Sequence, residues 1–344
     1  MRKYLSCLMI LLLFFGTVNG PPAFGQKTPK SDPKPDRNTA IIRAEVAYVI
    51  VNVTVLDPYS RVVTGLEKVN FEVYEDGKKQ KIRKFSSEEA PVSIGLVVDV
   101  SGSMSNKIEK VMRATELFME TCNKFDEFFL TVFSDGVRRL TDFTSDTTVI
   151  QNAFKPLLSI GGKGRTALFD AVYDSLSYMV AKARKFQPQT NEISGNSPPP
   201  EKRALLLISD GGDNYSRYTE KEVDNLLKEA DTQLYVIGIY DQPGYRSTPE
   251  EQRGPLLLQD LAEASGGRVF PITENDIGSS FGDTIKDTAK KIGIELRKQY
   301  VIGYYPENTN HDGRYRKIKV KVIAPRGLPP LKVYTKTGYY SSQN

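Results

Sequence analysis

The central part of the chain alternates between short, almost continuous apolar runs and segments with helical spacing of apolar residues. The first run, Ile94–Val100, has the composition of a parallel strand buried on both faces, and Ile108–Met119 follows it at helical spacing. Similar runs return later, at Phe128–Phe133, Ala204–Ser209, Gln233–Ile239 and Arg268–Phe270. The pattern predicts an α/β domain over residues 91–297, with a doubly wound, mostly parallel sheet flanked by helices. Val137–Asp142, after the hairpin signal Asp135-Gly136, is expected to be an antiparallel edge strand.

Strand-like segments of period two flank this domain on both sides. They are Val49–Val55, Phe71–Glu75, Lys79–Phe85, Gln299–Tyr305, Ile318–Val322 and Leu331–Tyr334. Asp76-Gly77 lies between the second and third of them and is a strong hairpin signal. Neither flank, residues 40–90 or residues 298–344, is large enough alone for a convincing core. We therefore expect one discontinuous, sandwich-like β domain into which the α/β domain is inserted.

The first residues have the pattern of a secretory signal peptide. Arg2 and Lys3 precede an apolar run, and the small residues Ala23 and Gly25 follow it, which places cleavage after Gly25. The alternative, a retained anchor, needs about 20 apolar residues, and the run is shorter. Residues 26–39 are rich in Pro, Lys and Asp and are expected to be a flexible linker. We therefore predict an exported protein without a stable transmembrane anchor, in the periplasm or outside the cell.

The charge and the cysteine count exclude several classes of function. Removing Arg2 and Lys3 lowers the formal charge of +5 by two, and the lysines are scattered, so a nucleic-acid partner is not expected. Only Cys122 would remain after cleavage, which rules out an intrachain disulfide and a zinc site built from thiolates. A histidine-rich metal site is excluded within one chain, because His311 is the only histidine.

Hard oxygen donors gather in three segments of the α/β domain. The first segment is D-x-S-x-S, with Asp99, Ser101 and Ser103 directly after the first buried strand. The second is a glycine-rich loop that carries Thr166 and opens a helix, and the third is Asp210 at the end of another buried strand. Ligands of open α/β sheets bind at the carboxyl ends of the strands, where these segments would converge. The pattern predicts a site for Mg²⁺, with Mn²⁺ or Ca²⁺ as alternatives.

These three segments resemble the metal-ion-dependent adhesion site of von Willebrand factor A domains, and the likeness extends over about residues 91–297. The flanks resemble a secreted bacterial subfamily first noted in acidobacteria, through residues 64–78, residues 300–306 and the Gly-Tyr-Tyr at 338–340. All five metal positions of the family are filled here, by Asp99, Ser101, Ser103, Thr166 and Asp210. The resemblance implies that the ion accepts an Asp or Glu carboxylate from a protein partner. It also implies that Thr166 joins the metal when the ligand is bound, and that the last helix, residues 275–297, shifts.

Simpler readings of the same residues exist. Asp99 could be a helix N-cap and Asp210 a turn former before two glycines. Around the metal, we expect a partner-binding rim formed by Arg165, Asp213 and Tyr215, although such residues are more often plain loop side chains.

Three classes of function therefore compete. The leading one is a non-catalytic protein-binding or adhesion module that uses the metal. The second is a structural subunit of an envelope complex with a structural metal. The third is a Mg²⁺-dependent hydrolase, which is disfavoured because no G-x-S-x-G elbow or Walker loop is present and the single histidine is distant. The oligomeric state is not predicted.

Overall fold

A computed structural model describes residues 48–160, 162–186, 202–240, 248–273 and 281–341. The predicted signal peptide (residues 1–25) and linker (residues 26–39) lie outside these residues, so both stay predictions. Among the helices that are described, none is long and apolar enough to cross a membrane.

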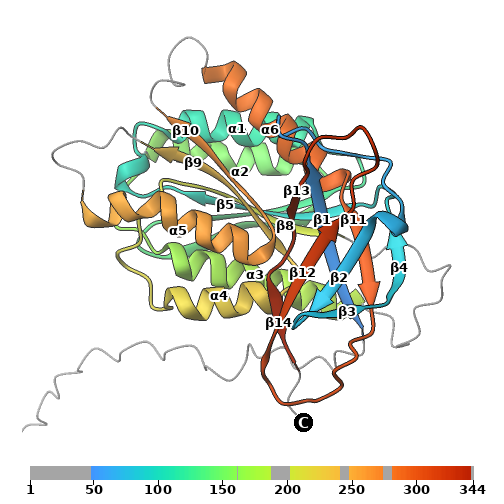
Figure 1. Ribbon diagram of the computed structural model, residues 1–344. Coiled ribbons are helices and arrows are strands. Elements are labelled where there is room, and N and C mark those ends of the chain that lie inside the picture. The colour runs from blue at the N-terminus through green and yellow to red at the C-terminus, as the bar shows by residue number, and fades with distance from the viewer. Residues whose placement is uncertain (1–47, 161, 187–201, 241–247, 274–280, 342–344) are drawn as a thin grey trace, which may run out of the picture. The chain divides into compact units, whose positions relative to one another are not determined.

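A six-stranded sheet forms the centre of the α/β part (Figure 1). Its strand order is β10 (Val269–Thr273), β9 (Gln233–Tyr240), β8 (Lys202–Ser209), β5 (Val92–Asp99), β6 (Glu127–Phe133) and β7 (Val137–Thr144). The five strands from β10 to β6 are parallel, and β7 pairs with β6 in the antiparallel sense. The predicted mostly parallel sheet with an antiparallel edge strand is confirmed.

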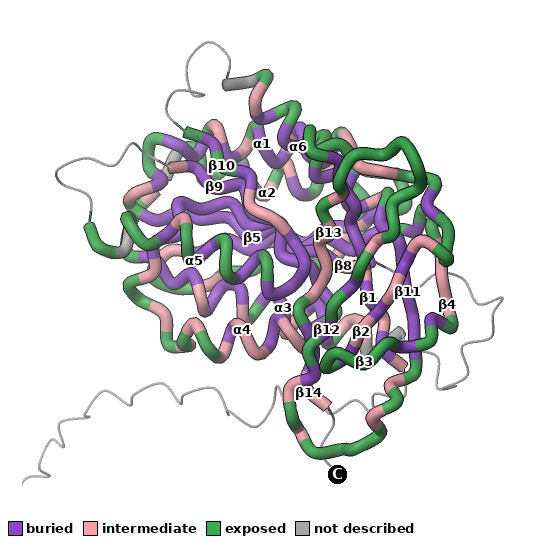
Figure 2. Tube along the Cα trace, viewed as in Figure 1, coloured by how far each residue is buried: buried purple, intermediate pink, exposed green. Residues whose placement is uncertain are grey.

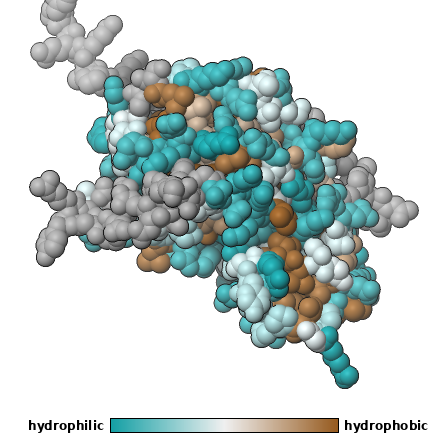
Figure 3. Space-filling view, turned by 90° about the horizontal axis from the view of Figure 1, so that it is seen from above, coloured by the Kyte–Doolittle hydropathy of each residue, from teal (hydrophilic) through white to brown (hydrophobic). Residues whose placement is uncertain are grey.

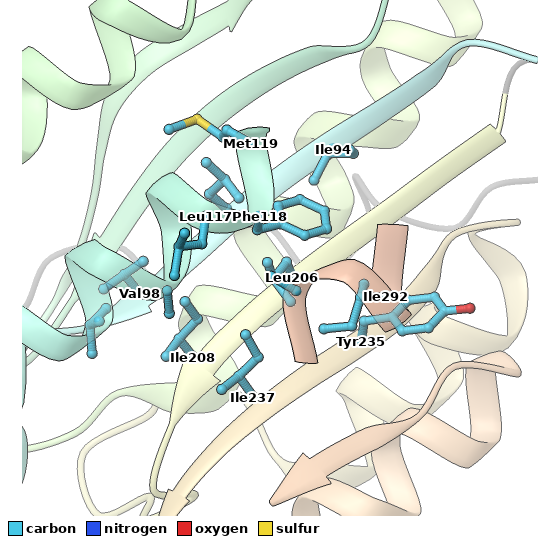
Figure 4. Close-up of a cluster of buried hydrophobic side chains, with 14 of the residues drawn as sticks. Ile94, Val98, Leu117, Phe118, Met119, Leu206, Ile208, Tyr235, Ile237 and Ile292 are labelled. Atoms are coloured by element: carbon cyan, nitrogen blue, oxygen red, sulfur yellow. The ribbon is translucent and has the colours of Figure 1, made fainter. Parts of the chain in front are cut away.

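Helices cover both faces of this sheet, as Figure 1 shows. One face packs on α1 (Ile108–Glu120), α2 (Thr147–Ile160) and α6 (Phe281–Arg297), and the other on α3 (Leu168–Phe186), α4 (Glu220–Glu229) and α5 (Pro249–Ser265). The strands are buried along almost their whole length (Figure 2), and Figure 4 shows how apolar side chains of β5, β8, β9, α1 and α6 meet in the core of the first face. The predicted fold class is confirmed. The helix α2 was not predicted, and it contains Pro156.

Strand β5 lies where the chain changes direction in the sheet. From β5 the chain goes to β6 on one side, and after β7 it returns to β8 on the other side of β5. Loops that leave the carboxyl ends of neighbouring strands toward opposite faces of a sheet leave a crevice between them, where ligands of such folds bind. This topology positions the candidate site at the carboxyl end of β5, next to β8.

The flanking segments form two four-stranded sheets around a third core. One has the order β13 (Lys332–Tyr334), β1 (Val49–Leu56), β11 (Tyr300–Tyr304) and β4 (Ile82–Ser86). The other has the order β14 (Gly338–Tyr340), β12 (Tyr315–Val322), β2 (Phe71–Glu75) and β3 (Lys78–Gln80). Each sheet joins strands from before and after the α/β part, and apolar side chains of both sheets share one buried cluster. We call this part the sandwich.

The segment Lys79–Phe85, expected to be one strand, is divided in two. β3 forms the hairpin with β2 across Asp76-Gly77, and both turn residues have positive φ, of 48° and 82°. β4 instead pairs with β11 in the other sheet. Gln80 and Ile82 are buried on either side of the exposed Lys81, so the chain crosses between the two sheets at this point.

A buried amide connects the sandwich to the α/β part. The Nε2 of Gln299, the residue before β11, donates to Gln233 Oε1 at 2.6 Å, to Tyr235 OH at 3.1 Å and to Thr54 Oγ1 at 3.2 Å. Nearby, the Nζ of the buried Lys202 donates to the carbonyls of Leu296 and Arg297 at the end of α6. Such buried polar contacts favour one arrangement of the sandwich on the α/β part, because a buried polar group that loses its hydrogen-bond partner costs free energy.

Candidate metal centre

Asp99 is the last residue of β5, and its side chain is fully buried. Its Oδ1 accepts the backbone N–H of Ser101 at 2.9 Å, and its Oδ2 accepts the hydroxyl of Ser209 at 2.7 Å. The Ser209 Oγ in turn accepts the N–H of Gly211 at 3.0 Å. The end of β8 therefore holds the carboxylate of β5 in one orientation.

The two serines of the D-x-S-x-S segment follow in a short 3-10 turn, Gly102–Met104. Ser101 Oγ and Ser103 Oγ are 3.2 Å apart, and Ser101 is buried. The glycine-rich loop packs directly on this turn, since the Gly102 N–H donates to Gly164 O at 3.0 Å. A Cβ added to Gly162 would meet Ser101 O at 2.2 Å, so only glycine allows this approach.

Thr166 lies at the end of the glycine-rich loop and is only 5 % exposed. Its backbone N–H donates to Asn214 Oδ1 at 2.9 Å, and its carbonyl accepts the N–H groups of Asn214 and Tyr215 at 3.0 and 3.1 Å. Gly164, two residues earlier, has φ of +88°, which allows the loop to turn toward β5. The loop after β8 thus fixes the backbone of Thr166 beside the serines.

Asp210 follows β8 and is 8 % exposed, and its Oδ1 accepts the N–H of Gly212 at 3.3 Å. Burial and, next, the negative charge of Asp210 raise the pKa of Asp99 to about 7. Burial and the same Asp210 charge also raise the pKa of Tyr240. Both carboxyl groups are buried, so little water screens their charges from each other.

Hydrogen bonds thus join Asp99 to Ser101 and place the hydroxyls of Ser101 and Ser103 next to each other, while Thr166 and Asp210 follow in the glycine-rich loop and at the end of β8. Within the described ranges, no group of three or more His, Cys, Asp and Glu side chains could hold a metal ion. A metal at this edge would therefore depend on hydroxyl oxygens as well as on the two carboxylates.

Two of the predicted rim residues lie together beside Thr166. The Arg165 guanidinium lies 3.3 Å from the centre of the Tyr215 ring, and its Nε is 3.8 Å from Asp135 Oδ1. The Arg165 backbone N–H also donates to Asp135. Arg165 and Tyr215 are exposed, so both can contact a partner.

The third predicted rim residue, Asp213, has a different position. Its Oδ1 accepts the hydroxyl of Ser216 at 2.5 Å and the N–H of Phe169, in the first turn of α3, at 3.3 Å. Burial raises the pKa of Asp213, which these hydrogen bonds partly offset. The Asp213 carboxylate therefore stabilises the start of α3, and its rim role stays a prediction.

The sequence analysis gave no role to Ser209, and it did not predict that Asn214 would hold the backbone of Thr166. Their roles come from hydrogen bonds to residues 110 and 48 positions away in the chain. A signal was present for Ser209, because it directly precedes Asp210 at the end of a buried strand.

Residues 94–212 match a protein-family model described as von Willebrand factor type A domain. The match includes all five candidate ligands. This part of the chain is therefore similar to a von Willebrand factor type A (VWA) domain. No curated protein matches the chain.

Solved structures with similar folds include VWA proteins. The von Willebrand factor type A protein from Catenulispora acidiphila is 12 % identical, over 87 % of this chain and 74 % of that one, with a TM-score of 0.43. The conserved hypothetical protein BatB from Bacteroides thetaiotaomicron is 17 % identical, over 59 % and 98 %, with a TM-score of 0.41. Proximal thread matrix protein 1 from the mussel byssus, with a zinc-occupied MIDAS motif, is 14 % identical, over 64 % and 49 %, with a TM-score of 0.41. At these levels the similarity assigns nothing to individual residues.

Proposed function

We propose that this chain is an exported, non-catalytic binding protein that captures an acidic side chain of a partner through a divalent metal, with Mg²⁺ as the first choice and Mn²⁺ or Ca²⁺ as alternatives. The proposed ligands are Asp99, Ser101, Ser103, Thr166 and Asp210. The observation that carries the proposal is the fully buried Asp99 carboxylate at the end of β5, which Ser101 and Ser209 hold in one orientation beside the hydroxyls of Ser101 and Ser103. Burial and, next, the charge of Asp210 raise the pKa of this carboxyl to about 7. Two neighbouring carboxylates in a site with little water are costly unless a cation neutralises them.

The chemistry of the donors fits Mg²⁺. Two carboxylates and three hydroxyls are hard oxygen ligands, and Mg²⁺ prefers such ligands while keeping part of its water shell. When bound, the ion would act as a Lewis acid, and the three hydroxyl ligands would add no negative charge to that of the two carboxylates. The chain's own residues do the positioning: Ser209 orients Asp99, and Asn214 holds the backbone of Thr166. Arg165 and Tyr215 offer the partner a cation stacked on an aromatic ring.

The proposed organisation of the chain is that of an exported protein. We propose that residues 1–25 are a signal peptide, residues 26–39 a linker, and residues 40–90 and 298–344 one β domain that carries the VWA domain of residues 91–297. The pairing of β1 with β11 and of β2 with β12 supports the discontinuous domain, because each pair joins strands from its two halves. The secreted bacterial subfamily suggested by the flanks belongs to this proposal.

Partner capture in the presence and absence of metal tests the function. The purified chain is used to pull partners from envelope extract in Mg²⁺ and in EDTA, with Thr166→Ala beside the wild type. A metal ligand that joins when the partner's carboxylate arrives is worth about 1–3 kcal/mol, so capture by Thr166→Ala should fall roughly 5- to 150-fold. Binding of Mg²⁺ to the free variant should fall much less.

Thr219→Ala is the matched control, because Thr219 also starts a helix but caps α4 away from the candidate site. It should lose some stability and no metal-dependent capture. Equal losses of Mg²⁺ binding and of capture in Thr166→Ala would favour a structural metal instead. Capture that is unchanged by EDTA would contradict the proposed function.

A further inference from the structure

Three loops lie at one end of the sandwich, which is its upper end in Figure 1. β1 ends at Leu56, and β13 begins at Lys332, which pairs with Leu56. β12 ends at Val322 in the other sheet, beside the start of β2, so residues 323–331 cross from one sheet to the other at this end. The turn of residues 57–61 follows β1, and the segment of residues 67–70 precedes β2. We call residues 57–61, 67–70 and 323–331 the sandwich tip.

The sandwich tip exposes large apolar side chains. The exposed fractions are 78 % for Tyr59, 77 % for Val69, 52 % for Ile323 and 42 % for Leu328. Two of the loops are joined, because the Ile323 N–H donates to Asn70 O at 2.8 Å and the Asn70 Nδ2 donates to Ile323 O at 3.1 Å. Figure 3, which views the molecule from above, shows hydrophobic residues among hydrophilic ones on this side of its surface. Isolated apolar residues on a surface are ordinary, whereas a group carried by three loops marks a contact surface.

The charge around these side chains is positive. The exposed cations of the sandwich tip and the adjoining β13 are Arg61, Lys68, Arg326 and Lys332. In the same segments Glu67 is the single exposed acid, since Asp57 is buried and its Oδ2 accepts the Nε of Arg61 at 2.7 Å. Exposed lysines also alternate along β12 toward the tip, at positions 317, 319 and 321. The tip therefore complements a negatively charged surface.

We propose that the sandwich tip docks this protein on the surface of an anionic lipid bilayer. Val69, Ile323 and Leu328 would enter the boundary between headgroups and acyl chains, and Tyr59 would lie at headgroup level, where amphipathic rings are favoured. The cations would contact lipid phosphates, and their apolar stems can remain against the apolar layer. Three protruding loops with apolar ends and a basic surround fit a bilayer, which has no fixed shape to match.

This surface is separate from the candidate metal centre. Residues 87–91 connect the sandwich to Val92, the first residue of β5. Asp99 is the last residue of this eight-residue strand, so the metal centre lies at the end of β5 that is farther from the sandwich. Docking at the tip would therefore leave the metal centre open to a partner, and the proposal stands whether or not a metal binds there.

Vesicle binding tests the proposal. Residues 26–344, without the predicted signal peptide, are floated with vesicles of phosphatidylcholine alone and of phosphatidylcholine with about one third phosphatidylglycerol, in EDTA. We expect binding to the anionic vesicles and little to the neutral ones. Each cation removed should lower the affinity for anionic vesicles about fivefold. The affinity of the double variant Lys68→Glu/Arg326→Glu should therefore fall at least roughly 25-fold. Ile323→Ser/Leu328→Ser should lose about tenfold or more on the same vesicles.

The matched control is Leu256→Ser, which changes an apolar residue on α5 that is more exposed, at 61 %, than Ile323 or Leu328, and which should bind like the wild type. Absence of binding to anionic vesicles, or losses of the same size in Leu256→Ser, would overturn the proposal. Light scattering of the wild type without vesicles tests whether the tip binds a second copy of the chain instead of a bilayer. Self-association that the Ile323→Ser/Leu328→Ser variant abolishes, without vesicle binding, would assign the tip to a second copy of the chain and equally overturn the proposal.

Discussion

Replacing Asp99 by Asn should stabilise the metal-free protein and abolish its response to Mg²⁺. Burial and Asp210 raise the pKa of Asp99 from 3.8 to about 7. Because the folded-state pKa is higher than the unfolded one, the folded protein holds this proton more tightly, and stability falls as the pH rises between these two values. Three pKa units at 1.36 kcal/mol each correspond to about 4 kcal/mol of destabilisation at pH 8.

The asparagine variant keeps the shape of the side chain and removes the charge. Part of the gain is lost because asparagine has one acceptor oxygen where Asp99 has two. Only one of the hydrogen bonds from Ser101 and Ser209 then keeps an acceptor, and this acceptor no longer carries a charge. We therefore expect about 2–4 kcal/mol in EDTA at pH 8, or roughly 5–15 °C in Tm. In Mg²⁺ at 100 times Kd the wild type should gain about 2.7 kcal/mol and the variant none.

Thermal unfolding followed by circular dichroism, at pH 8 in EDTA and in Mg²⁺, measures both effects. Asp213→Asn is the control, because this carboxylate lies in the same loop region but holds the start of α3. It should keep the full Mg²⁺ response. A wild type that Mg²⁺ does not stabilise, or an Asp99→Asn variant that is less stable than the wild type in EDTA, would refute the reasoning.

Three further predictions address the support of the site and the fold. Ser209→Ala removes the 2.7 Å hydrogen bond to Asp99 and should weaken Mg²⁺ binding about 10-fold or more, measured by calorimetric titration. Burial lowers the pKa of Lys202 to about 8, so this group makes the fold more stable as the pH rises from 8 toward 10.5. Lys202→Met should remove about 3 kcal/mol of that rise, measured by urea unfolding at both pH values. Ending the chain after Arg297 removes β11 and β13, which pair with β1 on both sides, so the truncated chain should aggregate in light scattering, whereas a soluble monomer would contradict the discontinuous domain.

The parallel sheet was predictable because its strands are buried on both faces. A strand such as β5 then appears in the sequence as one continuous apolar run, and all eight of its residues are buried. The helix α2 gave no comparable signal, because Pro156 lies inside it and disfavours a helix in a reading of the sequence alone. The division between β3 and β4 was missed because the alternation of period two continues from one strand to the other. Only their pairing with different strands, β3 with β2 and β4 with β11, separates them.

The candidate ligands were recognisable because they lie in short local patterns at strand ends. The residues that orient them were not, because their hydrogen bonds join loops that are distant in the chain. Asp213 illustrates the limit: the sequence analysis placed it at the rim, but only the structure shows its hydrogen bonds with Ser216 and the N-terminus of α3. The sequence indicates which oxygen-bearing side chains lie near a strand end, but it does not indicate the direction in which each side chain points.

Direct binding of Mn²⁺ to the EDTA-treated protein, followed by the electron paramagnetic resonance signal of the free ion, tests the central claim most directly. Mn²⁺ accepts the same oxygen ligands as Mg²⁺ and reports its own free concentration. We predict one bound Mn²⁺ per chain, which excess Mg²⁺ displaces and Asp99→Asn abolishes. A wild type that binds no Mn²⁺ at millimolar concentration, or an Asp99→Asn variant that binds it as tightly as the wild type, would contradict a metal centre at this edge of the sheet.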